Sequence, residues 1–157
     1  MTFGRADAPG TPRHRASRAD GPDLRMNVVH MIARTLKESR GDYSQLTLVE
    51  RHVQRVDIFD SYFTNDGIDG FFANVPLPEV WDETEAALQA VGAAPVAEVL
   101  RRARAAYVAA EALEDEDERN DSFLALKVFK REINQLNVDL EELIRQYVDR
   151  EYPWTDS

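Results

Sequence analysis

Apolar residues recur every three or four positions along most of the chain, which is the spacing of one face of an α-helix. The first stripe follows Asp23 and stops at Gly41, and glycine is typical of a helix end. A second stripe begins after Thr47, which can cap a helix together with Glu50 three residues later. Its apolar members are Val49, Val53, Val56, Phe59 and Phe63. These stripes predict the first two helices.

Prolines and glycines mark the limits of the next two predicted helices. Pro76 and Pro78 lie at the entry of the third, Gly92 ends it, and Pro95 opens the fourth. Their apolar faces contain Trp81, Thr84, Leu88 and Val91 in the third, and Val96, Val99, Leu100, Ala103 and Tyr107 in the fourth. Residues 123–147 predict one or two last helices with a break near residues 134–137. Because no stretch alternates with a period of two, the sequence predicts an all-α fold, a single compact domain of about five to seven helices.

A glycine-rich stretch at residues 65–74 separates the second helix from the third. It contains Gly67 and Gly70, followed directly by Phe71 and Phe72. Glycine adopts positive φ without strain, so the two glycines predict a tight turn after the second helix that directs both phenylalanines inward. The flanking residues Asn65 and Asn74 are expected to hold backbone groups. We therefore interpret this stretch as structural.

The two ends of the chain differ in composition from the middle. Residues 1–22 are rich in arginine, proline and glycine and have one aromatic residue, which predicts a disordered tail. The expected division is a tail over residues 1–22, a helical domain over residues 23–152 and a short C-terminal tail over residues 153–157. Residues 1–25 hold five basic and three acidic residues, so the remaining 14 basic and 26 acidic residues give the rest of the chain a net charge of -12.

The acidic balance limits the classes of partner. Lys and Arg number 19 against 29 Asp and Glu, giving a formal net charge of -10. This charge opposes direct binding to nucleic acid or to an anionic membrane, and it favours a basic protein as partner. The chain has no cysteine, no apolar run of membrane-spanning length and no signal-like start, so a soluble, cytoplasmic protein is expected.

No cofactor, metal or catalytic constellation emerges from the sequence. An EF-hand placed on Asp69 and Gly70 would put Gly67 and Pro76 where oxygen ligands are required, and no Lys-Ser/Thr pair follows the glycines to form a phosphate loop. The histidines at 14, 30 and 52 do not pair at helical metal spacing. We expect His52 to be a partly buried, hydrogen-bonded residue, and the protein not to be an enzyme.

The acidic residues gather in two places. We predict that these carboxylates contact a partner: Glu111, Glu114, Asp115, Glu116, Asp117, Glu118 and Asp121, then Asp139, Glu141 and Glu142. The first group is expected to lie at a frayed helix end or an exposed loop. Two interpretations of the acidity stay open. It either serves solubility alone, or it presents rows of negative charge that resemble the phosphates of a DNA duplex.

The glycine-rich stretch also carries a family resemblance. Residues 65–74 resemble the signature of a bacterial domain-of-unknown-function family that includes DNA mimic protein nineteen. The segment of residues 87–93, with Gly92, and the following Ala97, Leu100 and Ala103 resemble the next part of that family. The resemblance covers about residues 47–110, with a weaker similarity over residues 123–147. It implies a helical fold, a homodimer and binding to a transcription regulator in place of DNA. The signature residues Asn65, Gly67, Gly70, Phe71, Phe72, Asn74 and Gly92 have structural roles in this interpretation.

Two functional hypotheses follow. The first is a non-enzymatic acidic module that binds a basic protein such as a DNA-binding regulator, acting as a DNA mimic by occupancy. The alternative is an immunity-like or antitoxin-like protein that binds its partner through an apolar rim around Phe71, Phe72 and Trp81. Salt dependence distinguishes them, because ionic contacts weaken with salt and apolar contacts do not.

Overall fold

The computed structural model describes residues 14–155, and their regular structure is helical apart from an isolated bridge between Ser17 and Thr155. The helices are α1 (Leu24–Glu38), α2 (Leu48–Asn74), α3 (Pro78–Ala90), α4 (Ala94–Glu111), α5 (Glu116–Ala125), α6 (Lys127–Gln135) and α7 (Leu140–Glu151), with short 3-10 helices η1 (Arg18–Asp20) and η2 (Tyr43–Gln45). The all-α prediction is confirmed. None of the described helices combines the length and the apolar character needed to cross a membrane.

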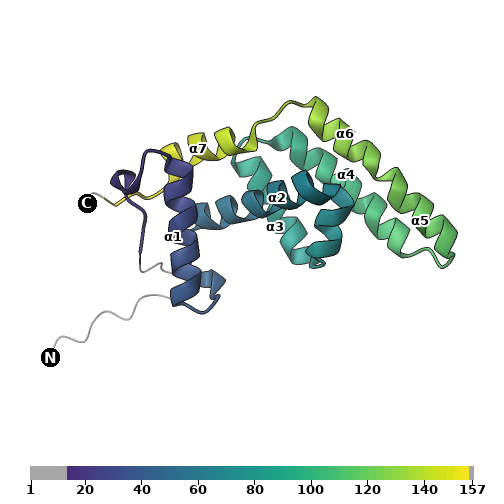
Figure 1. Cartoon of the computed structure of the whole chain (residues 1–157), viewed down its shortest axis with the longest axis horizontal. Coiled ribbons are helices and arrows are strands. Elements are labelled where there is room, and N and C mark those ends of the chain that lie inside the picture. The colour runs from purple at the N-terminus through teal and green to yellow at the C-terminus, as the bar shows by residue number, and fades with distance from the viewer. Residues whose placement is uncertain (1–13, 156–157) are drawn as a thin grey trace.

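Helix α2 is the centre of the fold. It packs against α1, α3, α4, α6 and α7. In Figure 1, α1 lies across one end of the molecule beside α7, and the connection between α4 and α5 forms the opposite end. Helices α5 and α6 follow one another along nearly one line before the chain turns into α7. The molecule is therefore elongated, with its two ends built from different parts of the chain.

The predicted helix boundaries follow from local capping. The Asp23 carboxylate accepts hydrogen bonds from the backbone N–H of Arg25 and Met26 at the start of α1. Thr47 and Glu50 form the expected capping box at the start of α2. Gly41 after α1 has φ of +84° and Gly92 after α3 has φ of +93°, a region in which residues with a Cβ are strained. These caps and helix ends depend on residues that are neighbours in the sequence, which is why the sequence predicted them correctly.

The glycine-rich stretch is a bend inside α2, which corrects the prediction of a turn after the second helix. Gly67 has φ of +77° and ψ of -174°, a conformation open almost only to glycine, and the chain is helical again up to Asn74. Gly70 does not have positive φ. A Cβ there would lie 2.3 Å from the Cβ of Asp66, so Gly70 permits a close approach of the chain to itself.

The bend directs two phenylalanines into the core, as predicted. Phe71 and Phe72 have no exposed surface. Asn65 and Asn74 each donate a side-chain hydrogen bond to the carbonyl four residues earlier, that of Ser61 and that of Gly70. Ring contacts then run through the core in the order Phe59, Phe71, Phe72, Trp81, Tyr107 and Phe123.

Both ends of the helical domain extend beyond the predicted limits. Residues 1–13 of the predicted tail lie outside the described residues. Residues 14–22 pack onto the domain: Ala16 is fully buried, and its N–H donates to the Tyr152 hydroxyl at 2.9 Å. Arg18 pairs with Asp149 and lies over the ring of Trp154. Trp154, in the predicted C-terminal tail, donates from its indole N–H to the carbonyl of Val148.

Candidate functional site

The larger predicted group of carboxylates lies at the end of the molecule where α4 turns back into α5 (Figure 1). We call it the acidic tip. All of its members are exposed: Glu111, Glu114, Asp115, Glu116, Asp117, Glu118 and Asp121. The prediction of a frayed end or loop is correct for the first half only, because α5 begins at Glu116. The rings of Tyr107 on α4 and Phe123 on α5, 5.5 Å apart, hold the two helices together behind the tip.

Part of the acidic tip serves the helix itself. The Asp115 side chain caps α5 by accepting from the N–H of Glu118 at 2.9 Å. Glu116, Asp117 and Glu118 occupy the first turn of α5. Negative charge at a helix N-terminus is favourable because the terminal N–H groups carry partial positive charge. The tip members from Asp115 onward are therefore fixed at the start of a capped helix.

Within residues 14–155, no member of the acidic tip forms an ion pair. Many carboxylates elsewhere are paired, for example Glu83 with Arg55, Glu98 with Arg101, and Glu132 with Arg102. The tip thus concentrates uncompensated negative charge at one end of the molecule.

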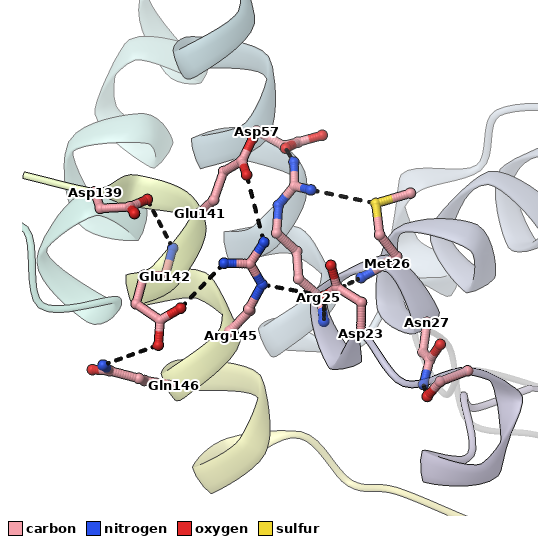
Figure 2. Close-up of polar contacts among 11 residues, drawn as sticks. Asp23, Arg25, Met26, Asn27, Asp57, Asp139, Glu141, Glu142, Arg145 and Gln146 are labelled. Carbon is pink, nitrogen blue, oxygen red and sulfur yellow. Dashed lines mark hydrogen bonds and ion pairs between the residues drawn. The ribbon is translucent and has the colours of Figure 1, made fainter.

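The smaller predicted group lies at the start of α7, separated from the tip by the length of α5 and α6 (Figure 1). Figure 2 shows that Asp139 caps α7 by accepting from the N–H of Glu142 at 3.1 Å. Glu141 and Glu142 both pair with Arg145. The structure therefore does not join the ten predicted carboxylates into one surface, and the second group is largely used within the fold.

Arg145 is the centre of an ionic network that sequence reasoning missed. Besides Glu141 and Glu142, its guanidinium contacts Asp23 at the start of α1 at 3.3 Å (Figure 2). A neighbouring pair joins Arg25 of α1 to Asp57 of α2. These bonds connect α1, α2 and α7, so their first role is structural. No signal in the sequence indicated them, because the partners lie 32 and 122 residues apart.

A small acidic cavity lies beside this network. Its volume is about 370 Å³, and polar side chains at its wall include Asp60, Asn134, Asn137 and Asp139. The pKa of the Asp60 carboxyl is raised because it is half-buried, and because Glu141, Asp57 and Asp139 add negative potential that Arg25 only partly offsets. Within residues 14–155, no group of three or more His, Cys, Asp or Glu side chains has an arrangement suited to a metal ion.

Replacing Asp60 with asparagine is expected to stabilise the protein at neutral pH. The folded state holds the Asp60 proton more tightly than the unfolded chain, so the unfolding free energy falls as pH rises from the ordinary aspartate pKa through the raised value. The Asp60→Asn variant lacks this loss. Urea unfolding of the wild type and the variant at a series of pH values measures how the free energy of unfolding changes with pH. Asp57→Asn is the matched control, because it removes the partner of Arg25 and should destabilise by about 1–3 kcal/mol. Equal behaviour of the two variants would contradict the assignment.

The remaining predicted residues have structural positions. The Nδ1 atom of His52 lies 2.7 Å from the Tyr147 hydroxyl, and burial lowers the pKa of His52, which confirms the prediction of a partly buried, hydrogen-bonded histidine. Phe71, Phe72 and Trp81 are 0%, 0% and 4% exposed. The prediction of an apolar contact rim around them is therefore wrong, because a partner cannot reach side chains that form the core.

One comparison with known proteins found a match. The sequence model of a family described as DMP19-like protein matches residues 44–152. No curated protein and no solved structure matches the chain. The matched range begins just before α2 and ends just after α7, so it includes the bend at Gly67, the acidic tip and the acidic cavity. Helix α1 and the residues packed before it lie outside it.

Proposed function

The chain belongs to the DMP19-like protein family, and from that premise we propose that it is a non-enzymatic acidic protein that binds a basic protein through the acidic tip. In its most specific form, the proposal is a DNA mimic that occupies the DNA-binding surface of a basic regulator. The observation that carries it is the acidic tip, where seven exposed carboxylates have no ion pair within the described residues.

The physical basis is competition for a basic surface. A DNA-binding protein holds arginine and lysine side chains where phosphates normally lie, and a fixed group of carboxylates offers the same sign of charge. The tip charges from Asp115 onward stand on a capped helix that packs against α4, so little ordering of these groups is needed before they meet a partner. Long-range attraction to a positive surface also speeds association, and this effect weakens with added salt.

The family-matched segment supports a basic rather than an acidic partner. Residues 44–152 hold 11 basic and 23 acidic residues, a net charge of -12, whereas residues 1–43 hold eight basic and five acidic residues. The acidity thus belongs to the part of the chain that defines the family. Carboxylates in that segment that form ion pairs, such as Glu141 with Arg145, are less open to a partner than those of the tip.

The test compares two variants of equal charge. The tip variant carries Glu114→Gln, Glu116→Gln, Asp117→Asn and Glu118→Gln. The control carries Glu38→Gln, Asp66→Asn, Glu79→Gln and Glu151→Gln, at exposed sites that are not members of the tip. Each chain is immobilised and exposed to extract of the source cells, and retained DNA-binding proteins are purified. Fluorescence anisotropy then measures whether the chain displaces a labelled DNA duplex from each.

We expect the wild-type chain and the control to displace the duplex, and the tip variant to do so at least about tenfold less well, which corresponds to about 1.4 kcal/mol. Displacement should weaken steeply between about 50 and 300 mM salt. Retention that does not depend on salt, or that is equal for the tip variant and the control, would contradict the proposal. In that case the acidity serves solubility.

A further inference from the structure

A polar cavity lies where the chain turns from α1 into η2 (Figure 1), and we call it the η2 cavity. Its volume is about 250 Å³, below the range of about 300–1,000 Å³ that is typical of sites for drug-sized ligands. All of its lining residues have side chains that can form hydrogen bonds: His14, Thr35, Glu38, Ser39, Asp42 and Gln45. The η2 cavity therefore suits a small polar molecule. It lies almost wholly outside the family-matched residues 44–152.

The wall of the η2 cavity includes a buried hydroxyl that has no partner. Thr35 is 5% exposed, and its Oγ1 atom forms no hydrogen bond within the described residues. Burial of a hydroxyl is costly unless another group bonds to it, and most such groups in folded proteins are bonded. The Thr35 hydroxyl therefore requires a hydrogen-bonding molecule in the cavity, either water or a ligand.

The charge of the η2 cavity favours a cation as the ligand. Glu38 and Asp42 both line it, and among the described lining residues none is a lysine or an arginine. The Arg34 guanidinium lowers the pKa of Glu38, and the Ser44 hydroxyl lowers the pKa of Asp42, each by donating a hydrogen bond. Both carboxylates are therefore ionised at neutral pH. Negative potential in a cavity attracts cations and disfavours anions.

An organic ammonium ion fits this wall better than a metal ion does. His14, Glu38 and Asp42 are of the types that bind metals, yet no group of three such side chains among residues 14–155 has an arrangement suited to a metal ion. An ammonium group donates three hydrogen bonds, and hydroxyl, amide and carboxylate oxygens all accept them. Thr35 and Ser39 supply hydroxyl oxygens beside the two carboxylates. Two carboxylates in one small cavity match a molecule with an ammonium group at each end.

We propose that the η2 cavity binds a small aliphatic diamine. Glu38 and Asp42 hold the two positive charges, and the Thr35 hydroxyl accepts a hydrogen bond from one of the ammonium groups. The ligand thus satisfies the polar atom that the chain itself leaves without a partner. The η2 cavity and the acidic tip lie at opposite ends of the molecule (Figure 1), so this inference goes beyond the proposed function and does not rest on it.

Titration calorimetry of the full chain with the diamine putrescine tests the proposal, and a dissociation constant of about 1 mM or below is expected. Thr35→Val keeps the shape and charge of the side chain but removes the hydroxyl, so it should weaken binding at least about tenfold. Unspecific attraction of a diamine to an acidic chain depends on charge and would not change. Without putrescine, the thermal midpoint of Thr35→Val should equal or exceed that of the wild type, because no hydrogen bond is lost. Absent binding up to about 10 mM, or equal binding by the two chains, overturns the proposal.

A matched pair of charge variants provides a second test. Glu38→Gln and Glu79→Gln each remove one exposed negative charge, but only Glu38 lines the η2 cavity. Glu38→Gln should weaken putrescine binding about threefold to fivefold, the effect of one exposed ion pair, and Glu79→Gln should leave it unchanged. Equal weakening by both variants would show that putrescine responds only to the net charge, and it overturns the proposal.

Butylamine distinguishes a free diamine from the lysine of a partner protein, because a lysine side chain also has an aliphatic chain with a single ammonium group. It should bind at least about tenfold more weakly than putrescine, since it meets only one of the two carboxylates. Equal binding of the two amines would indicate a lysine side chain as the ligand and overturns the diamine.

Backbone amide signals in NMR spectra locate the bound putrescine. Titration should shift the amide signals of Ser39 and Gln45 at the η2 cavity and leave that of Glu116 in the acidic tip in place. Larger shifts at Glu116 than at Ser39 and Gln45 would place the diamine on the acidic tip, which overturns the proposed site.

Discussion

Replacing Phe72 with alanine is expected to lower the free energy of unfolding by about 3–5 kcal/mol, because it removes a fully buried ring that contacts three other aromatic rings. Phe72 has no exposed surface, and its ring centroid lies 5.4 Å from that of Phe71, 5.0 Å from that of Trp81 and 5.0 Å from that of Tyr107. Those neighbours belong to three helices and cannot all move in to fill the space. Urea unfolding followed by circular dichroism measures the loss.

The midpoint of thermal unfolding should fall by roughly 10–15 °C in the same variant. Val108→Ala is the control, since it also shortens an apolar side chain but one that is 49% exposed, and it should change stability by less than about 0.5 kcal/mol. A loss below about 1 kcal/mol for Phe72→Ala would mean that the core can collapse around the missing ring. Such a result would contradict the role assigned to the bend at Gly67, which is to drive Phe71 and Phe72 inward.

The parts of the fold that the sequence predicted are those determined by neighbouring residues. Caps at Asp23 and Thr47 act over two or three residues, and the apolar stripes repeat over one turn of helix. The predicted break near residues 134–137 lies where α6 ends and Asn137 has φ of +51°. For the glycine-rich stretch, the sequence predicted the turn and the inward phenylalanines but not the helix that follows Gly67. That helix depends on how the segments on either side of Gly67 pack.

The parts that the sequence did not predict depend on distant partners. Residues 14–22 have the composition of a disordered tail. Ala16 nevertheless bonds to Tyr152, which lies 136 positions later in the chain, and Arg18 bonds to Asp149, which lies 131 positions later. Leu124 and Val128 fit the helical spacing, but their exposure follows only from which side of α5 and α6 packs on the domain. Exposure of the acidic tip was predictable because its seven carboxylates lie within the short segment of residues 111–121. Which other carboxylates are neutralised, such as Asp23 by Arg145, was not.

Replacing Glu50 with leucine is expected to destabilise the protein by about 2–4 kcal/mol, although leucine is apolar and the site is fully buried. One carboxyl oxygen of Glu50 accepts from the N–H of Thr47 at 2.8 Å, and the other accepts from the Tyr152 hydroxyl at 2.8 Å. Burial raises the pKa of Tyr152, so its hydroxyl keeps the proton that it donates. Leucine leaves both donors without an acceptor, and each unsatisfied buried donor costs about 1–3 kcal/mol.

A double-mutant cycle separates this bond from other effects of the substitution. Tyr152→Phe removes the donor, Glu50→Leu removes the acceptor, and the double variant should lose less than the sum of the two because both remove the same bond. Losses that add fully would contradict a direct coupling. Chemical denaturation at neutral pH supplies all four free energies, and Val108→Ala again shows the effect of an uninvolved change.

The same network should transmit the loss of Glu50 to the N-terminal segment. The Tyr152 hydroxyl also accepts from the N–H of Ala16, which precedes the family-matched residues 44–152 by 28 positions. Amide hydrogen exchange at Ala16 should therefore accelerate in Glu50→Leu before global unfolding sets in, because Tyr152 is free to rotate. Exchange at Val56, in the middle of α2, should follow global stability alone. If both amides accelerate equally, the segment is anchored by the packing of Ala16 and by Arg18, and Glu50 serves only the start of α2.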